Sequence, residues 1–199
     1  EISATKIRNS QKRVIWLTGN VGSGKTSLAY LLKERLSAIV LDGDELRASI
    51  STDLGFSKKD RDAHNLRVAR LAKILNLQNF NVVVSVIAPF RSTRQKITKM
   101  IDPYWIYIKG GKRGKNMPYE VPKKPHLTID PSKEALLGSL EKIVKEIGNL
   151  QALKVRQEYQ KIDRRRKNPK TKPARIPPRP LLHAGKFSLG FAKSKSPEK

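Results

Sequence analysis

Five short apolar runs occur in the first 130 residues, and each has the length and composition of a buried strand. They occupy residues 14–17, 38–41, 82–87, 105–108 and 127–129. The third run indicates a strand most strongly, because it is continuous and β-branched, as expected where both faces of a sheet are covered. The pattern predicts a sheet of about five strands.

Apolar residues recur with helical spacing between these runs. The spacing predicts helices over 25–36, from about Asp44, over 57–77, over 92–100 and over 133–147. Ser57 and Asp60 form a capping box, which marks where the third of these helices begins. Its buried side is predicted to carry Leu66, Ala69, Ala72 and Leu77. Strands that alternate with helices predict an α/β fold with a parallel sheet and right-handed crossovers.

The length of 199 residues suits one globular domain with an appendage. We predict a compact domain over 1–150 and a basic, Pro-rich extension over 151–199, helical at first and then extended or disordered unless bound. The net charge is +25, and the extension holds 15 Lys and Arg residues against 3 Asp and Glu. This surplus is typical either of a solvated linker or of a strip that contacts nucleic acid or another polyanion.

Composition also excludes some classes of protein. The chain has no Cys, so it can form neither a disulfide framework nor a Cys-ligated zinc site. No apolar run approaches the roughly 20 residues that a membrane-spanning helix requires, so no membrane partner is expected. These features fit a cytoplasmic location.

A phosphate-binding loop follows the first predicted strand and opens the first predicted helix. Its residues match the pattern G-x-x-x-x-G-K-[ST], which in this context predicts a P-loop kinase built as a three-layer sandwich. We expect backbone N–H groups and the helix N-terminus to hold the phosphates of ATP. Lys25 should reach the β- and γ-phosphates and Thr26 should coordinate Mg²⁺. The predicted ATP site comprises Gly19, Asn20, Val21, Gly22, Ser23, Gly24, Lys25, Thr26 and Ser27.

Two carboxylates, Asp42 and Asp44, end the second predicted strand. Ligands of α/β sheets bind at the carboxyl ends of strands. Carboxylates at that edge, beside a phosphate loop, favour a role in positioning Mg²⁺ and in accepting the proton of an acceptor alcohol. Together with Lys25 they are the candidate catalytic residues.

The order and spacing of further motifs resemble those of adenylylsulfate kinases. The resemblance covers about residues 13–94 and returns weakly over 118–130. It rests on the P-loop, on Leu41-Asp42-Gly43-Asp44 with Arg47, on Asp53-Leu54-Gly55-Phe56-Ser57 with Asp60-Arg61, and on Ser85-Val86-Ile87-Ala88-Pro89-Phe90-Arg91.

This resemblance implies transfer of the γ-phosphoryl group of ATP to the 3′-hydroxyl of a small nucleotide, adenosine 5′-phosphosulfate. It implies that Asp42 and Asp44 lie at the acceptor hydroxyl. Phe56 would stack on the adenine of the acceptor, and Arg47 and Arg61 would hold its phosphosulfate. Ile87 would line the adenine pocket. Forked, permanently charged Arg side chains and a flat apolar ring suit such an acceptor.

The chain departs from the family pattern at three places. His64 stands where the family has an acceptor-binding Asn, with Asn65 next to it, so His64 is the candidate contact here. Ala88 replaces the usual Ser. The long basic lid of the family is reduced to residues 109–116, which can cover only the phosphates, through Lys112, Arg113 and Lys115.

Two other functions stay open on the sequence alone. A kinase of the same fold that acts on a hydroxyl within nucleic acid or a modified nucleoside is favoured by the short lid, by His64 and by the basic extension. A non-catalytic nucleotide- or nucleic-acid-binding module is the third possibility, and the intact Lys25, Thr26, Asp42 and Asp44 argue against it. The pattern leaves oligomer formation open.

Overall fold

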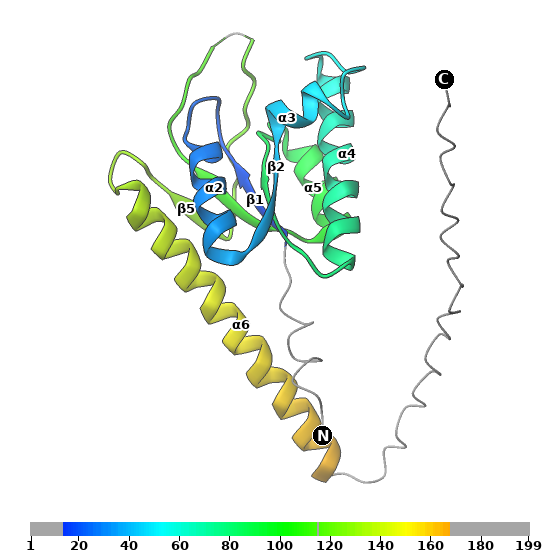
Figure 1. The fold of residues 1–199 in the computed structure, drawn as a ribbon, viewed down its shortest axis with the longest axis vertical. Coiled ribbons are helices and arrows are strands. Elements are labelled where there is room, and N and C mark those ends of the chain that lie inside the picture. The colour runs from blue at the N-terminus through cyan, green and yellow to red at the C-terminus, as the bar shows by residue number, and fades with distance from the viewer. Residues whose placement is uncertain (1–13, 115, 168–199) are drawn as a thin grey trace, which may run out of the picture. The chain divides into compact units, whose positions relative to one another are not determined.

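A computed structural model of the protein describes residues 14–114 and 116–167 (Figure 1). Five parallel strands form one sheet in the order β2-β3-β1-β4-β5. The strands are β1 (Val14–Thr18), β2 (Ala38–Asp42), β3 (Asn81–Ser85), β4 (Tyr104–Ile108) and β5 (Leu127–Ile129). The predicted strands are all present, and the sheet has the predicted number of them.

Five helices are described along the same part of the chain. They are α2 (Lys25–Leu36), α3 (Gly43–Ala48), α4 (Lys58–Leu77), α5 (Arg91–Ile101) and α6 (Leu136–Lys167). The predicted capping box begins α4, because the Ser57 hydroxyl accepts the backbone N–H of Asp60 at 3.1 Å. The helix positions therefore follow the local sequence signals closely.

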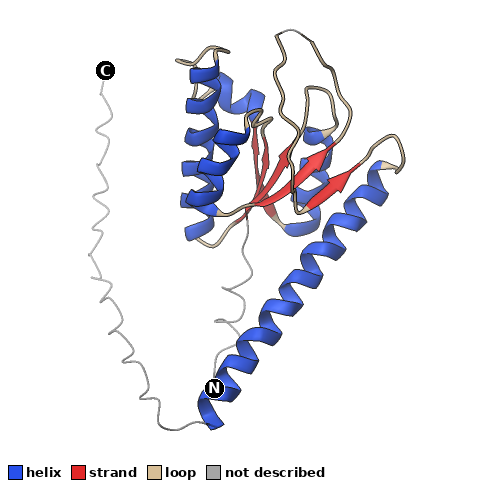
Figure 2. Ribbon diagram, turned by 180° about the vertical axis from the view of Figure 1, so that it is seen from behind, coloured by secondary structure: helices blue, strands red, loops and turns tan. Residues whose placement is uncertain are grey.

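Helices cover both faces of the sheet, so the fold has three layers (Figure 2). On one face the buried side chains of α2 and α6, such as Leu32 and Ile143, pack against alternate strand residues, including Ile15 and Ile106. On the other face α3, α4 and α5 pack against Trp16 and its neighbours. Both faces of the strands are buried, which explains their nearly continuous apolar sequence.

The strand order brings the sequence motifs to one edge of the sheet. The P-loop follows β1, which lies beside β3, and β3 in turn pairs with β2. Asp42 at the end of β2 is in register with Ser85 at the end of β3. A site assembled from loops at these carboxyl ends agrees with the general rule for open α/β sheets.

Three predicted details differ from the structure. The third apolar run leaves the sheet after Ser85, although the prediction extended it to Ile87. On α4, Ala69 and Ala72 are buried as predicted, but Leu77 is 72% exposed, because the buried side of the helix ends at Ala72. The helix predicted over 133–147 begins at Leu136.

The last helix, α6, also bears on the domain organisation. It continues without interruption to Lys167, since no Gly or Pro occurs between Gln151 and that residue. The chain separates into compact units Glu1–Tyr159 and Gln160–Lys199, so the division predicted near Leu150 falls within a helix and stays a prediction. Within residues 14–114 and 116–167, every helix is too short or too polar to cross a bilayer.

Candidate active site

The P-loop has the backbone geometry that phosphate binding requires. Gly22 and Gly24 adopt positive φ angles of 71° and 90°, which side chains with a Cβ rarely allow. Gly19 is required for a different reason: a Cβ at this position would lie only 2.4 Å from the carbonyl oxygen of Ile108 and would clash with it. The loop therefore needs glycine at each of these positions of the predicted motif.

Lys25 lies in the floor of the loop, and its side chain is buried. Its Nζ donates to the carbonyl oxygen of Asn20 at 2.6 Å and to the Ser23 hydroxyl at 3.4 Å. Burial lowers the pKa of Lys25 to about 8, while the carboxylates of Asp42 and Asp44 oppose that shift. A bound polyphosphate would stabilise the charged ammonium form.

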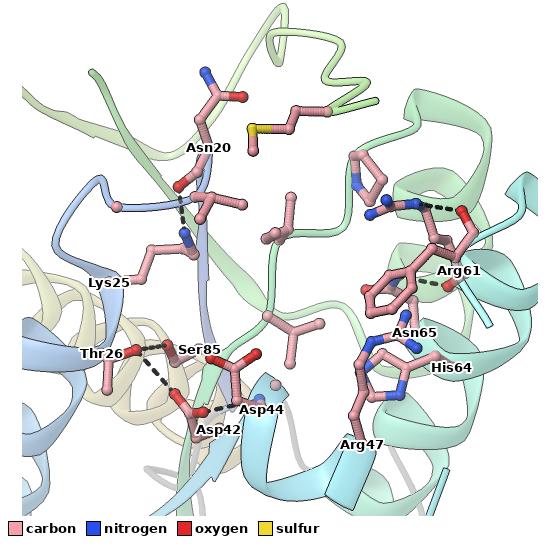
Figure 3. A pocket seen from close by; sticks show the side chains of 18 of the residues that line it. Asn20, Lys25, Thr26, Asp42, Asp44, Arg47, Arg61, His64, Asn65 and Ser85 are labelled. Atoms are coloured by element: carbon pink, nitrogen blue, oxygen red, sulfur yellow. Dashed lines mark hydrogen bonds between the residues drawn. The ribbon is translucent and has the colours of Figure 1, made fainter. Parts of the chain in front are cut away.

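Thr26 and Asp42, which are 16 residues apart in sequence, meet at the bottom of the site (Figure 3). The Thr26 hydroxyl donates to Asp42 Oδ2 at 3.0 Å and lies 3.4 Å from the Ser85 hydroxyl. Three oxygen-bearing side chains thus converge where a P-loop kinase binds its metal ion. Mg²⁺ prefers one or two protein oxygens together with phosphate oxygens and water, so Thr26 and Asp42 fit it.

No group of three or more His, Cys, Asp or Glu side chains in the described ranges could hold a metal ion by itself. A Mg²⁺ ion at this place would consequently depend on the phosphates of the nucleotide for most of its ligands. Thr26 as the direct ligand of Mg²⁺, with the acidic pair helping to position the ion, stays a prediction, and the contact between Thr26 and Asp42 arises from the strand order.

The two acidic residues differ in their surroundings. Asp42 is buried, and its Oδ1 accepts the backbone N–H of Asp44 at 3.0 Å, so it caps α3 as well as contacting Thr26. Asp44 is exposed to the cavity in the first turn of that helix. Its carboxylate makes no hydrogen bond with another side chain described here. Asp44 is thus the carboxylate that is free to contact an incoming hydroxyl.

A cationic and aromatic wall lies across the cavity from the P-loop. The Phe56 ring is 68% exposed, and the guanidinium carbons of Arg47 and Arg61 lie 4.6 Å and 5.3 Å from its centroid. Arg61 Nε donates to the Phe56 carbonyl at 2.8 Å, and Arg47 Nη1 donates to the Gly55 carbonyl at 3.1 Å. The Phe56 ring is therefore open to the cavity instead of being packed in the core.

The loop that carries Phe56 is itself held by an ion pair. Arg67 on α4 binds the Asp53 carboxylate, with 2.6 Å between Nη1 and Oδ1 and 2.9 Å between Nη2 and Oδ2. This bidentate contact with the Arg67 guanidinium lowers the pKa of Asp53 to about 2. Phe56 therefore projects from a segment that is fastened to α4.

His64 and Asn65 complete this wall from α4, and each is only 2% exposed (Figure 3). Burial, followed by the nearby Arg47 and Arg67 charges, lowers the pKa of His64 to about 4, so its imidazole is neutral near pH 7. The structure places the predicted contact residue His64 in the cavity lining. Asn65 Nδ2 donates to the Arg61 carbonyl at 2.7 Å.

The P-loop wall and the cationic, aromatic wall line one cavity of about 330 Å³. Its walls include five predicted ATP-site residues and every predicted acceptor residue: Asn20, Val21, Gly22, Lys25, Thr26, Asp42, Asp44, Arg47, Phe56, Arg61, His64 and Ile87. Four other predicted ATP-site residues lie outside this lining, namely Gly19, Ser23, Gly24 and Ser27. The two predicted halves of the site therefore share one space.

The short lid contacts the P-loop. Gly110 and Gly111 have φ angles near 80°, which let the Lys112 N–H reach the Val21 carbonyl at 2.7 Å. A Cβ on Gly111 would lie 2.6 Å from the same carbonyl oxygen, so the approach requires glycine. Lys112 and Arg113 are exposed there, while Lys115 lies outside the described residues.

The segment that follows the lid is fastened beside the cavity by Arg94 and Tyr119. Buried Arg94 donates to the carbonyl oxygens of Ala88 at 2.6 Å and of Glu120 at 2.5 Å. The Tyr119 hydroxyl lies 2.9 Å from the Thr18 hydroxyl, and burial raises the pKa of Tyr119 to about 12. These contacts position Pro118 and Met117 on the cavity wall.

Sequence reasoning did not assign Asn65, Ser85 or residues 116–118 to the site, although they line it. Asn65 is adjacent to a predicted contact, and Ser85 is the first residue of a motif that carries the family resemblance, so the sequence already drew attention to both positions. Residues 116–118 gave none, because their place depends on how Arg94 and Tyr119 hold the chain that follows them.

The arrangement of the site can be compared with that of known proteins. A sequence model described as adenylylsulphate kinase matches residues 11–110, which is half of the chain. The chain belongs to the adenylylsulphate kinase family. A probable adenylyl-sulfate kinase of Bacillus subtilis is 31% identical over 185 residues, which cover 73% of this chain and 94% of the relative.

Solved structures of the family have the same fold. The Mycobacterium tuberculosis APS kinase in complex with AMPPNP and APS matches with a TM-score of 0.64 and 26% identity, covering 69% of this chain and 98% of that one. A hexameric APS kinase from Thiobacillus denitrificans matches with a TM-score of 0.58 and 27% identity, covering 71% of this chain and 30% of that one.

Membership of the adenylylsulphate kinase family confirms two predictions made from the sequence. The fold is the predicted α/β sandwich of a P-loop kinase. The protein is an ATP-dependent phosphotransferase with an alcohol group as acceptor, rather than a non-catalytic binding module. The roles of individual residues are a separate question, which the geometry of the cavity addresses.

Proposed function

We propose that this protein transfers the γ-phosphoryl group of ATP to the 3′-hydroxyl of adenosine 5′-phosphosulfate. One observation carries the proposal: a single cavity has the P-loop on one wall and a cationic, aromatic wall of Arg47, Phe56 and Arg61 on the other. Asp44 lies in the lining shared by the two. The names of the relatives support the same reaction.

The P-loop side of the cavity binds and activates ATP. Backbone N–H groups of the loop and the ammonium of Lys25 hold the β- and γ-phosphates, and they stabilise the charge that develops on them during transfer. Thr26 and Asp42 would hold Mg²⁺, which would supply positive charge to neutralise the phosphates. Lys25 Nζ lies 2.6 Å from the Asn20 carbonyl oxygen, which places the ammonium inside the loop that holds the phosphates.

The opposite side binds the acceptor. Arg47 and Arg61 bind the phosphosulfate, because guanidinium groups pair with such oxyanions through two parallel hydrogen bonds. The exposed Phe56 ring stacks on the purine, and Ile87 adds an apolar contact. Asp44 accepts the proton of the attacking hydroxyl. Direct assay with ATP and adenosine 5′-phosphosulfate tests the reaction, and absence of turnover would refute it.

Replacing Phe56 or Arg61 with alanine is expected to weaken the acceptor site selectively. Each variant should raise the KM for adenosine 5′-phosphosulfate about 10-fold or more, since stacking alone contributes about 1–3 kcal/mol per base. The KM for ATP should stay within about 3-fold of the original value, because neither residue belongs to the P-loop wall.

Arg70→Ala is the matched control for Arg61→Ala, because Arg70 lies on the same helix and is exposed to solvent. It should leave both KM values unchanged. An equal rise of both KM values in Phe56→Ala and Arg61→Ala would mean that these residues support the whole site rather than the acceptor.

A second candidate function is phosphorylation of a hydroxyl within a nucleic acid. Two observations favour it: the lid is short, and residues 151–199 have 12 more basic than acidic side chains. We propose that this extension binds a polyanion, whichever acceptor the kinase uses. Binding to phosphates would release counterions, so its affinity should depend strongly on salt.

Shortening the chain separates the two candidate functions. A chain that ends at Leu150 keeps the buried anchors of α6, Leu140, Ile143 and Ile147, so it should fold and bind ATP. It should lose salt-dependent binding to duplex DNA, for which each neutralised phosphate contributes about −0.9 to the slope of log K against log salt. Titrations of both lengths at two salt concentrations measure this.

Activity of the same two proteins identifies the acceptor class. Turnover of adenosine 5′-phosphosulfate should survive the truncation, whereas turnover of a hydroxyl within a polymer should fall with the loss of binding. Equal, salt-insensitive DNA binding by both lengths would contradict the polyanion proposal. Oligomer formation, as in the hexameric relative, and a cytoplasmic location stay predictions.

A further inference from the structure

A second cavity, of about 640 Å³, is lined by α5, by Trp105 of β4 and by the segment 122–125. It shares no lining residue with the active-site cavity. We call it the basic cleft, because five of its ten lining residues are basic: Arg91, Arg94, Lys99, Lys123 and Lys124. Among the described residues, its lining contains no Asp or Glu. Like charges around one cavity repel one another, so the arrangement favours an anion between them.

Arg94 gives the clearest sign of such an anion. It is only 7% exposed, yet no carboxylate in the described ranges forms an ion pair with it. Its guanidinium donates to the carbonyl oxygens of Ala88, Pro89 and Glu120, which use at most three of its five N–H donors. Burial lowers the pKa of Arg94, and nearby Tyr119 and Glu120 oppose that shift only in part. Buried charges in proteins are normally paired, so the charge of Arg94 indicates an absent counterion.

The other cations of the basic cleft are available to a ligand. Lys99, Lys123 and Lys124 are exposed, and their ammonium groups contact no other side chain in the described part of the protein. Arg91 donates from Nε to the Val121 carbonyl at 3.3 Å, which leaves its terminal nitrogens for other contacts. A bound anion could therefore pair with these side chains without breaking an existing ion pair.

The spacing of the cations sets the size of the anion. Arg91 and Lys99 both line the cleft from α5 and are eight residues apart, which is about 12 Å along a helix. One phosphate group cannot contact both side chains at their bases, whereas a chain of several phosphates can extend between them. Lys123 and Lys124 add charge from the segment 122–125. A multiply charged anion therefore matches the cleft better than a single phosphate or sulfate ion does.

The basic cleft is built to recognise charge and not a nucleobase. Trp105 is the aromatic residue in its described lining, and this side chain is only 7% exposed. Its ring packs against Trp16 with 5.2 Å between the centroids, and its Nε1 donates to the Thr98 hydroxyl at 2.9 Å. No aromatic face is left to stack on a base, as single-stranded nucleic acids require. A concave cavity of this volume suits a small molecule.

We propose that the basic cleft is a second anion-binding site, which takes a small molecule that carries several phosphate or sulfate groups. The ligand is held by its charges, with Arg94 at the wall of the cleft and the three lysines and Arg91 around it. Inorganic polyphosphate and the polyphosphate part of a free nucleotide share this chemistry. The site is separate from the P-loop and from the acceptor wall, so the proposal stands or falls independently of the acceptor that the kinase uses.

A titration with inorganic tripolyphosphate, followed by NMR, tests the proposal on the full chain. The indole N–H of Trp105 reports on the basic cleft, and the backbone N–H of Gly22 reports on the P-loop, which also binds phosphates. Both signals should shift, each with its own dissociation constant. ATP in place of tripolyphosphate distinguishes the two sources of the ligand, because tighter binding of ATP at the Trp105 signal would identify a nucleotide and equal binding an inorganic polyphosphate.

A double variant, Lys123→Gln with Lys124→Gln, removes two charges of the basic cleft. It should weaken tripolyphosphate binding at the Trp105 signal about 10-fold or more, because two charge-assisted contacts are lost. The matched control is Lys73→Gln with Lys96→Gln, which removes the same charge at exposed helix positions outside both cavities. The control should change that dissociation constant by less than about 2-fold. The Gly22 signal should titrate alike in all three proteins, which also shows that they are folded.

Three results would overturn the proposal. The first is a Trp105 signal that does not respond to tripolyphosphate or to ATP. The second is an equal loss of affinity in the cleft variant and in the control, because the effect would then come from overall charge. The third is a Trp105 signal that responds to duplex DNA but to neither small molecule, which would make the cleft part of a nucleic-acid surface.

Discussion

Replacing Lys25 with alanine should lower kcat by about 10²-fold or more, because a positioned donor to the transferring phosphoryl group is lost. The structure supports this expectation, since Lys25 is buried within hydrogen-bonding distance of the loop that would hold the phosphates. The fold should survive, because the Lys25 side chain bonds only to the Asn20 carbonyl and the Ser23 hydroxyl of its own loop. Steady-state kinetics with circular dichroism would measure both effects.

Lys33→Ala is the matched control, because Lys33 is an exposed lysine near the other end of the same helix. It should leave kcat unchanged. A Lys25→Ala protein with normal turnover would contradict the phosphoryl-transfer role of the P-loop, whereas an unfolded one would show that the lysine is structural.

Asp44→Asn should lower kcat by about 10²-fold or more while the KM for ATP stays within about 3-fold, because general-base catalysis typically contributes 10²–10⁴-fold. Asp44 is exposed in the cavity lining, so an acceptor hydroxyl can reach it. An amide has nearly the same shape but cannot take the proton. Kinetics over a range of both substrates would separate the two effects.

Asp42→Asn should give a different result from Asp44→Asn. Asp42 contacts Thr26 and caps α3, so its loss should raise the Mg²⁺ concentration needed for half-maximal activity and also reduce stability. Glu45→Gln is the control for both, since the Glu45 carboxylate accepts from the Tyr30 hydroxyl on the surface instead of facing the cavity. If both aspartate variants keep a near-normal kcat, the acidic pair has no catalytic role, and Asp42 serves only to cap α3.

Much of the fold could be read from the sequence, because its signals are local. The P-loop pattern spans eight residues between a strand and a helix, and the backbone angles of Gly22 and Gly24 follow from the turn itself. The box of Ser57 and Asp60 begins α4 by hydrogen bonds across three residues. The boundaries were less accurate at β3 and α6, where the chain continues with residues that suit either outcome.

The site itself was only partly predictable. The sequence placed Lys25, Asp42 and Arg61 among the functional residues through motif spacing, and the structure brings them to one cavity. The sequence could not show that Thr26 bonds Asp42, since this contact depends on β3 lying between β1 and β2. Strand order is set by the packing of the whole sheet and not by any one segment.

By itself the sequence therefore determined the fold class, the phosphate loop and the family, because each depends on residues close together in the chain. Only the tertiary structure decided which residues are buried at the cavity. The sequence names His64 as a candidate contact but does not predict its burial, and in the structure it is 2% exposed on α4. Burial depends on contacts between distant segments, which no local pattern records.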